Sequence, residues 1–274
     1  LDQSNAFGSH VTMQAGDGSA AFNDITFVDS AAVKLHSSAG SDGDLFINAG
    51  TDLAISGDLN ITATTGNITQ GAEVAVGATS TFTTSASNGT ITLNDADNAF
   101  TGAVALNTNG SSGNATIKND RALLLAASSV GGAFSATATA GNITQNGALT
   151  ITGTSTLVTS ANHGTITLTN TGNALTGKLL ITTNDDSPGT VGTVNIDGGT
   201  TNLIIGLSTI DGNLTLRSGG TITDDGIATV KGTLTATTDA SASAITLNDL
   251  AVDGAFTLDP NGTGAVTVSY THLR

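Results

Sequence analysis

The pentapeptide Gly66-Asn67-Ile68-Thr69-Gln70 occurs again as Gly141-Asn142-Ile143-Thr144-Gln145, and the offset between the copies is 141 − 66 = 75. Two further pairs of blocks share this offset: Gly89–Leu93 with Gly164–Leu168, and Asn98–Gly102 with Asn173–Gly177. Three blocks in one register define a repeat. A fixed long period is typical of stacked units that share one continuous core, so the chain is predicted to be an array.

The repeat continues toward the end of the chain with a small shift. Gly220-Thr221-Ile222-Thr223 matches the repeated block, but about four residues later than the offset of 75 predicts. Likewise, Ile117 corresponds to Ile196 at an offset of 196 − 117 = 79. The extra residues come from Thr182–Gly192, which replaces the shorter Asn107–Asn114. An insertion that leaves the flanking pattern intact is expected in a surface loop.

Each long unit contains short segments that alternate apolar residues with Thr or Asn, which predicts half-buried strands. These segments are Leu59–Thr62, Asn67–Thr69, Ser80–Thr83, Thr90–Leu93 and Ala103–Leu106. Turn-forming residues separate them, as in Ser87–Gly89 and Asn109–Ser111. Ala122–Ala127 has the best helical propensity, but its repeat partner Asn202–Gly206 contains Ile-Ile and Gly, which favours a strand. We expect about three turns of roughly 25 residues in each long unit.

Apolar residues exchange for one another at matching positions of the copies. Leu59 becomes Phe134 and then Leu214, Phe82 becomes Leu157, and Phe100 becomes Leu175. Such exchange is what a stacked core permits, so these side chains are predicted to point inward. Residues 1–267 are predicted to form one β-solenoid domain. Residues 268–274 depart from the repeat, and we interpret them as translated cloning or adapter sequence.

Composition supports a turn-rich β protein, with 35 Gly, 2 Pro and 3% aromatic residues. The net charge of −15 argues against nucleic acid and anionic membrane surfaces as partners, since both require basic patches. No apolar run approaches the roughly 20 residues of a membrane helix. The chain has no Cys, which fits a bacterial protein exported in an unfolded state, and no signal peptide is recognisable at Leu1. We expect the chain to be a segment of a longer protein.

The runs Gly66–Gln70, Gly89–Leu106 and Ala122–Leu125 resemble the repeat arrays of filamentous-haemagglutinin-type adhesins, which are very large secreted proteins of Gram-negative bacteria. The resemblance implies an all-β fold, a right-handed parallel β-helix. The repeats of this chain would supply about three long units of three rungs plus partial units. It also implies export through an outer-membrane pore by two-partner or autotransporter secretion, and an extracellular or cell-surface location. The implied partners are glycans or proteins on host or neighbouring cells.

Carboxylate pairs are the strongest candidates for a metal site, because Ca²⁺ takes several oxygen ligands. Besides Asp95 with Asp97, the calcium candidates are Asp42, Asp44, Asp185, Asp186, Asp224 and Asp225. Ser41–Phe46 resembles half of a calcium-binding nonapeptide, but no second copy follows. Asp is a common turn residue, so the interpretation that we favour is solvated turns without metal, cofactor or catalytic residues.

The histidines and threonines offer weaker candidates. His10, His36, His163 and His272 are far apart in the sequence, and His163 occupies the turn position of Asn88 in the preceding copy. A surface turn is therefore favoured over a metal ligand. Thr-x-Thr triplets such as Thr62–Thr64 are similar to those of ice-binding solenoids, but those need short, equal rungs, and Thr is common on any exposed strand face.

The function predicted from the sequence is that of a structural shaft in a bacterial surface-exposed or secreted adhesin. One alternative is a module that binds carbohydrate or a host protein directly, through a loop such as Asn184–Gly189 or an exposed strand face. A minor alternative is a polysaccharide-active β-helix enzyme. That alternative is disfavoured because no pair of carboxylates converges with a basic residue and aromatic platforms on successive rungs.

Overall fold

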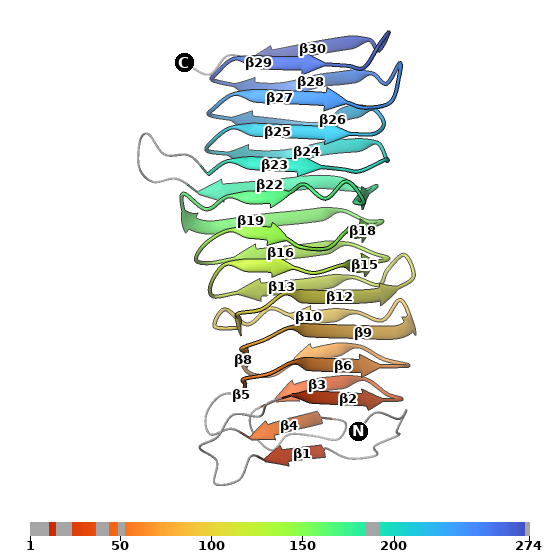
Figure 1. Cartoon of the computed structure of the whole chain (residues 1–274), viewed down its shortest axis with the longest axis vertical. Coiled ribbons are helices and arrows are strands. Elements are labelled where there is room, and N and C mark those ends of the chain that lie inside the picture. Colours follow the sequence, from red (N-terminus) through yellow and green to blue (C-terminus); the bar gives the residue numbers. More distant parts are fainter. Residues whose placement is uncertain (1–10, 15–23, 37–43, 49–52, 185–191, 272–274) are drawn as a thin grey trace.

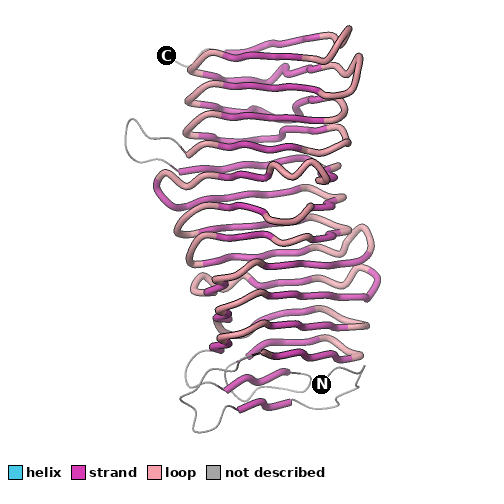
Figure 2. The backbone as a smooth tube through the Cα atoms, viewed as in Figure 1, coloured by secondary structure: helices cyan, strands magenta, loops and turns pink. Residues whose placement is uncertain are grey.

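A computed structural model describes residues 11–14, 24–36, 44–48, 53–184 and 192–271 of the chain. Those residues contain thirty β-strands and no helix (Figure 1). From β5 (Leu53–Ile55) onward the chain coils upward, and each turn lies on the one before it (Figure 2). The fold is therefore a parallel β-solenoid, as the repeat predicted.

Two long sheets form the broad faces of the coil, and we call them sheet I and sheet II. Sheet I contains, in spatial order, β1 (Val11–Gln14), β4 (Asp44–Asn48), β3 (Val33–His36), β7 (Ile68–Gln70), β10 (Ile91–Leu93), β13 (Ala115–Asn119), β16 (Phe134–Ala138), β19 (Ser155–Asn162), β22 (Lys178–Asn184), β24 (Leu203–Ile210), β26 (Ile222–Val230), β28 (Ile245–Val252) and β30 (Val266–Thr271). Sheet II contains β2 (Ile25–Asp29), β6 (Leu59–Ala63), β9 (Ser80–Ser87), β12 (Val104–Asn109), β14 (Leu123–Leu125), β17 (Ile143–Gln145), β20 (Ile166–Leu168), β23 (Val194–Asp197), β25 (Leu214–Ser218), β27 (Leu234–Thr238) and β29 (Phe256–Asp259).

The five segments predicted to be strands all lie wholly or mostly in strands, and Leu123–Leu125 is a strand rather than part of a helix. Neighbouring strands of both long sheets pair in parallel, and the sequence separation of paired residues gives the length of a turn. That separation is 134 − 115 = 19 for Ala115 and Phe134. It is 194 − 166 = 28 for Ile166 and Val194, whose turn contains the insertion. At the amino-terminal end, β4 lies between β1 and β3, an order that the repeat did not predict.

The long unit makes three and a half turns, half a turn more than the sequence suggested. Between β6 in sheet II and β16 in sheet I, its equivalent one repeat later, the chain passes through β7, β9, β10, β12, β13 and β14 and so crosses between the sheets seven times. The third copy, β25, lies in sheet II again. Equivalent residues of successive copies therefore face opposite sides of the solenoid.

Two short stacks of strands show this alternation directly. The first stack is β5 (Leu53–Ile55), β8 (Val74–Val76) and β11 (Ala99–Phe100), and the second is β15 (Ser128–Val130), β18 (Leu149–Ile151) and β21 (Ala174–Leu175). The second stack is the equivalent of the first, one repeat later. Figure 1 shows β5 and β8 on one edge of the solenoid and β15 and β18 on the other. Each stack gives the turns that it spans a narrow third face beside sheets I and II.

The interior is a continuous ladder of apolar side chains. The six side chains predicted to point inward are all buried: Phe82, Phe100, Phe134, Leu157, Leu175 and Leu214. The rings of Phe82 and Phe100 meet edge to face with centroids 5.9 Å apart. Strand burial alternates, as in β6, where Leu59, Ile61 and Ala63 are buried and the residues between them are half-exposed. β30 continues past the expected boundary at residue 267 and pairs with β28 through Val268 and Tyr270.

Replacing Phe100 tests the ladder. Phe100→Ala should lower the free energy of unfolding by about 3–5 kcal/mol, because it removes a fully buried ring and leaves a cavity beside Phe82. Phe100→Leu introduces the residue found at the equivalent position 175 and should cost less than about 1.5 kcal/mol. Urea unfolding followed by circular dichroism measures both. Equal stability of the two variants would show that the ring does not fill the core.

Candidate functional site

A repeated polar arrangement joins Gln70, at the end of β7, to Asn98, which is fully buried. The two side-chain amides form a reciprocal pair: Gln70 Nε2 donates to Asn98 Oδ1 at 2.8 Å, and Asn98 Nδ2 donates to Gln70 Oε1 at 2.9 Å. Asn98 Oδ1 also accepts from the N–H of Val74 at 2.9 Å. Its Nδ2 donates to the carbonyl oxygen of Lys118 at 3.2 Å, so one side chain connects three turns at the corner where β8 begins.

The same pair recurs in the next copy of the repeat. Gln145 Nε2 donates to Asn173 Oδ1 at 2.9 Å, Asn173 Nδ2 donates back at 3.0 Å, and the N–H of Leu149 donates to Asn173 Oδ1 at 2.9 Å. These four residues are polar members of the repeated blocks. The blocks served to measure the repeat length, and no structural role was predicted for the polar residues. Their recurrence in both copies is the signal that could have assigned them to a corner.

The third copy lacks this pair. Its equivalent of Gln145 is Asp224 (224 − 145 = 79). Its equivalent of Asn173 is Leu250 (250 − 173 = 77), because Leu175 and Val252 occupy matching places above Ile151 and Val230. Here β26 and β28 run through the corner as strands of 9 and 8 residues, where the earlier copies break into two short strands. The Gln–Asn pair is therefore associated with the narrow third face of the solenoid.

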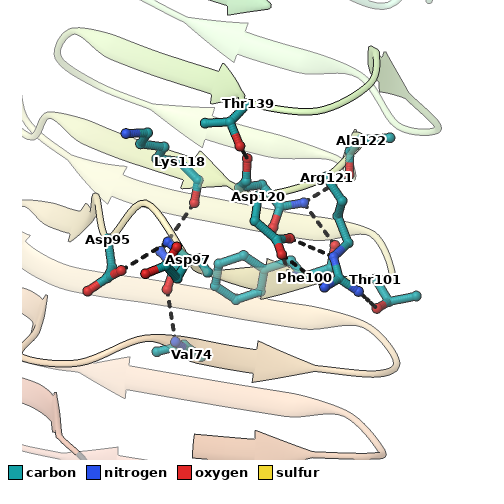
Figure 3. Close-up of polar contacts among 12 residues, drawn as sticks. Val74, Asp95, Asp97, Phe100, Thr101, Lys118, Asp120, Arg121, Ala122 and Thr139 are labelled. Carbon is teal, nitrogen blue, oxygen red and sulfur yellow. Dashed lines mark hydrogen bonds and ion pairs between the residues drawn. The ribbon is translucent and has the colours of Figure 1, made fainter. Parts of the chain in front are cut away.

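A second buried amide, Asn119, supports the neighbouring corner. Its Oδ1 accepts from the N–H of Phe100 at 2.8 Å, and its Nδ2 donates to the carbonyl oxygens of Phe100 at 3.0 Å and Ala122 at 2.9 Å. Figure 3 shows Phe100, Ala122 and the adjacent Arg121 at this corner. Arg121 donates to both carboxylate oxygens of Asp120, at 2.6 and 3.1 Å, which raises the pKa of the guanidinium.

Asn or Asp residues before the strands bond to the following turn. In each case a side-chain oxygen accepts a backbone N–H one turn further on: Asp58 from Thr79, Asn67 from Thr90, Asn114 from Ala133, Asn142 from Thr165, Asn202 from Thr221 and Asn213 from Thr233. The hydrogen bonds from Thr79 lower the pKa of Asp58 below its ordinary value. These oxygens stabilise the stack of turns.

The carboxylate pairs lie apart from one another. Asp97 donates its N–H to Asp95 Oδ1 at 3.0 Å in an exposed turn, also drawn in Figure 3. Asp225 lies 2.7 Å from Lys178 Nζ, and Asp224 accepts the N–H of Asp249 at 2.6 Å. Within the residues that the structure describes, no group of three or more His, Cys, Asp or Glu could hold a metal ion. Asp224 and Asp225 are therefore not brought to a common metal site.

The other candidates lie at or beyond the limits of the described residues. Asp42, Asp185 and Asp186 fall outside them, as do His10 and His272. Asp44 begins β4, and His36 ends β3. His163 lies in a turn with a backbone φ of 65°, as the substitution of Asn88 by His163 predicted.

A polar recess of about 370 Å³ forms a groove on sheet II. Its lining includes Asn195 and Asp197 from β23, Thr215 and Arg217 from β25, and Thr237 from β27. A second recess of about 300 Å³ lies over the short strands β8 and β11 and reaches Arg121. The first groove combines carboxylate, guanidinium, amide and hydroxyl groups on three successive turns.

Together, the coil and its turn-to-turn polar contacts define a repeat protein of the parallel β-solenoid class. The sequence profile of a family described as Repeats of unknown function (DUF5649) matches residues 23–107, 112–182 and 189–257. These matches cover most of the chain, so the protein belongs to that family. No curated protein and no solved structure matches the chain. The described residues form no helix and so include no candidate for a membrane-spanning helix.

The corner pair can be tested by removing Asn98. Asn98→Ala should lower the free energy of unfolding by about 1–3 kcal/mol or more, because Gln70, the N–H of Val74 and the carbonyl of Lys118 lose a buried partner. Asn94→Ala, at an exposed position, is the control and should change stability by less than about 0.5 kcal/mol. Thermal unfolding measures the melting temperature of each variant, and equal values for the two would contradict the assignment.

At the turn position shared by Asn88, His163 and Ala242, a substitution is expected to increase stability rather than lower it. All three have positive φ, between 62° and 65°, and this conformation is costly for Ala. Ala242→Gly should raise the free energy of unfolding by about 0.5–1 kcal/mol. Ala240→Gly, two residues earlier in the same turn, should not stabilise. Chemical denaturation measures both, and a destabilising Ala242→Gly would show that the turn does not require this backbone angle.

Proposed function

We propose that the chain is a structural shaft, a display segment of a bacterial surface-exposed or secreted adhesin, as the resemblance of its repeats implies. The shaft would hold other regions of a longer protein away from the cell. It would meet surface glycans or proteins of host or neighbouring cells through that parent protein, after export through an outer-membrane pore.

The observation that carries the proposal is that the polar side chains of the repeat motifs bind the next turn. Asn67, Asn142, Gln70 and Gln145 all make such contacts, and Asn98 connects three turns. Each turn is therefore held by backbone pairing, by the apolar ladder and by side-chain amides. Stability in such an array is approximately a sum over neighbouring turns, which suits a long rod.

The rod length follows from the strand spacing. Sheet II has eleven strands in its main path and therefore ten intervals. At about 4.8 Å per interval the described coil is about 50 Å long. One long unit of three and a half turns adds about 17 Å of that length. Reach is thus proportional to the number of units.

This proportionality is the test of the shaft. A second copy of residues 66–140 inserted between residues 140 and 141 should extend the rod by about 17 Å with an unchanged cross-section, because each new turn meets its native neighbour or that neighbour's repeat equivalent. Small-angle X-ray scattering of the full chain measures both quantities. A Gly/Ser insertion of equal length at the same point is the control.

The control should add a flexible loop and no rod length. If the duplicated unit gave the same scattering as the Gly/Ser insertion, the units would not stack as independent spacers, and the shaft proposal would fail. A compact particle with a radius of gyration near the globular value of about 2.2·N^0.38 Å would also contradict it.

A further inference from the structure

The groove on sheet II contains an arginine held between two carboxylates from the turns on either side. Arg217 Nε donates to both oxygens of Asp239, at 3.0 and 2.8 Å, and lies 3.9 Å from Asp197 Oδ2. Within the described residues these contacts engage Nε alone. The terminal nitrogens of Arg217, which carry up to four N–H donors, make no hydrogen bond within the described residues.

Asp197 supplies a fixed acceptor beside these donors. Its side chain is 9% exposed, and its Oδ1 accepts the N–H of Gly199 at 2.8 Å. That hydrogen bond fixes the orientation of the carboxylate and leaves Oδ2 on the side of Arg217. The groove thus presents an ordered acceptor next to a guanidinium whose terminal N–H groups have no hydrogen bond within the described residues. This pattern recognises a group able both to donate and to accept.

Hydroxyl and amide groups flank this centre along the solenoid axis. Asn195 pairs in register with Thr215, and Arg217 pairs with Thr237. Parallel strands repeat at about 4.8 Å, so the groove offers a polar group at each step over three turns. The Thr methyl groups and the Arg217 stem add apolar surface between the polar groups. A linear ligand with regularly spaced hydroxyls matches this alternation.

The solenoid itself does not require these residues. The positions equivalent to Asp197, Arg217 and Thr237 one copy earlier are Lys118 (197 − 118 = 79), Thr137 (217 − 137 = 80) and Val158 (237 − 158 = 79). These three earlier residues also pair in register on neighbouring strands, and they build the same coil without an Asp–Arg centre. The groove is therefore an addition to the repeat, confined to the last copy.

We propose that this groove binds a neutral saccharide chain that lies along the solenoid axis across β23, β25 and β27. An anionic ligand is disfavoured because Asp197 and Asp239 flank the arginine and the chain carries a net charge of −15. A metal ion is disfavoured because a guanidinium occupies the centre. A neutral polyol satisfies both the Asp197 acceptor and the Arg217 donors. The proposal is independent of the shaft function, since it concerns one face of the last copy.

Titration of the isotope-labelled full chain with neutral hexasaccharides tests the proposal. The probes are maltohexaose, cellohexaose and the hexamer of N-acetylglucosamine, with hexagalacturonate as the acidic comparison. We expect saturable amide shifts on β23, β25 and β27 with at least one neutral probe, and weaker binding of hexagalacturonate. Arg217→Ala should weaken that binding by about tenfold or more, as expected for the loss of charged hydrogen-bond donors.

Two further variants separate binding from folding. Thr215→Val with Thr237→Val preserves side-chain volume and both ion pairs of Arg217, yet should also weaken binding. Arg121→Ala removes an exposed, Asp-paired arginine elsewhere on the solenoid and should leave binding unchanged. Unaltered circular dichroism confirms the fold of each variant. The proposal is overturned if no neutral probe shifts these strands, if hexagalacturonate binds more tightly, or if Arg217→Ala and the double variant both retain full affinity.

Discussion

The whole architecture depends on parallel pairing between successive turns. A turn of this coil cannot satisfy its own backbone N–H and C=O groups, so each group must find a partner in the turn above or below. This constraint fixes the register: a one-residue slip would bring the half-exposed Thr residues of a strand inward and its Leu or Ile residues outward. The buried ladder from Ile25 to Val252 shows that the strands keep their apolar side inward along the coil, even where a β-bulge shifts the register, as between Gly206 and Ser208.

Corners are the weak points of such a coil, because there the backbone turns away from the ladder and needs other partners. Gln70 with Asn98, and Gln145 with Asn173, supply these partners from within the turn and from its neighbours. Gly102 at the next corner passes so close to the carbonyl oxygen of Ala78 in the preceding turn that a Cβ would collide with it. The polar residues and glycines of the repeated motifs therefore serve mainly to form the corners. The buried Ile68 and Phe100 of the same motifs belong to the core.

The extra half turn in each long unit decides which face of the solenoid each copy of the repeat occupies. Because successive copies face opposite sides, a feature acquired by one copy is not repeated along the same face by the next. The groove around Arg217 is such a feature: its counterparts Lys118 and Thr137 lie on sheet I, whereas Arg217 lies on sheet II. A shaft built in this way can carry a local recognition site without changing the stacking of its other turns.

Local periodicity and substitution between copies were enough to predict the fold class, the strands, the inward ladder and the turn position of His163. The sequence could not determine the number of turns in a unit, because one repeat can be divided in more than one way among turns of different lengths. Pairing partners such as Leu59 with Ser80 and Ala115 with Phe134 decided that number. The groove also needed the tertiary structure, since Asp197, Arg217 and Asp239 belong to three different turns and meet only because consecutive turns stack.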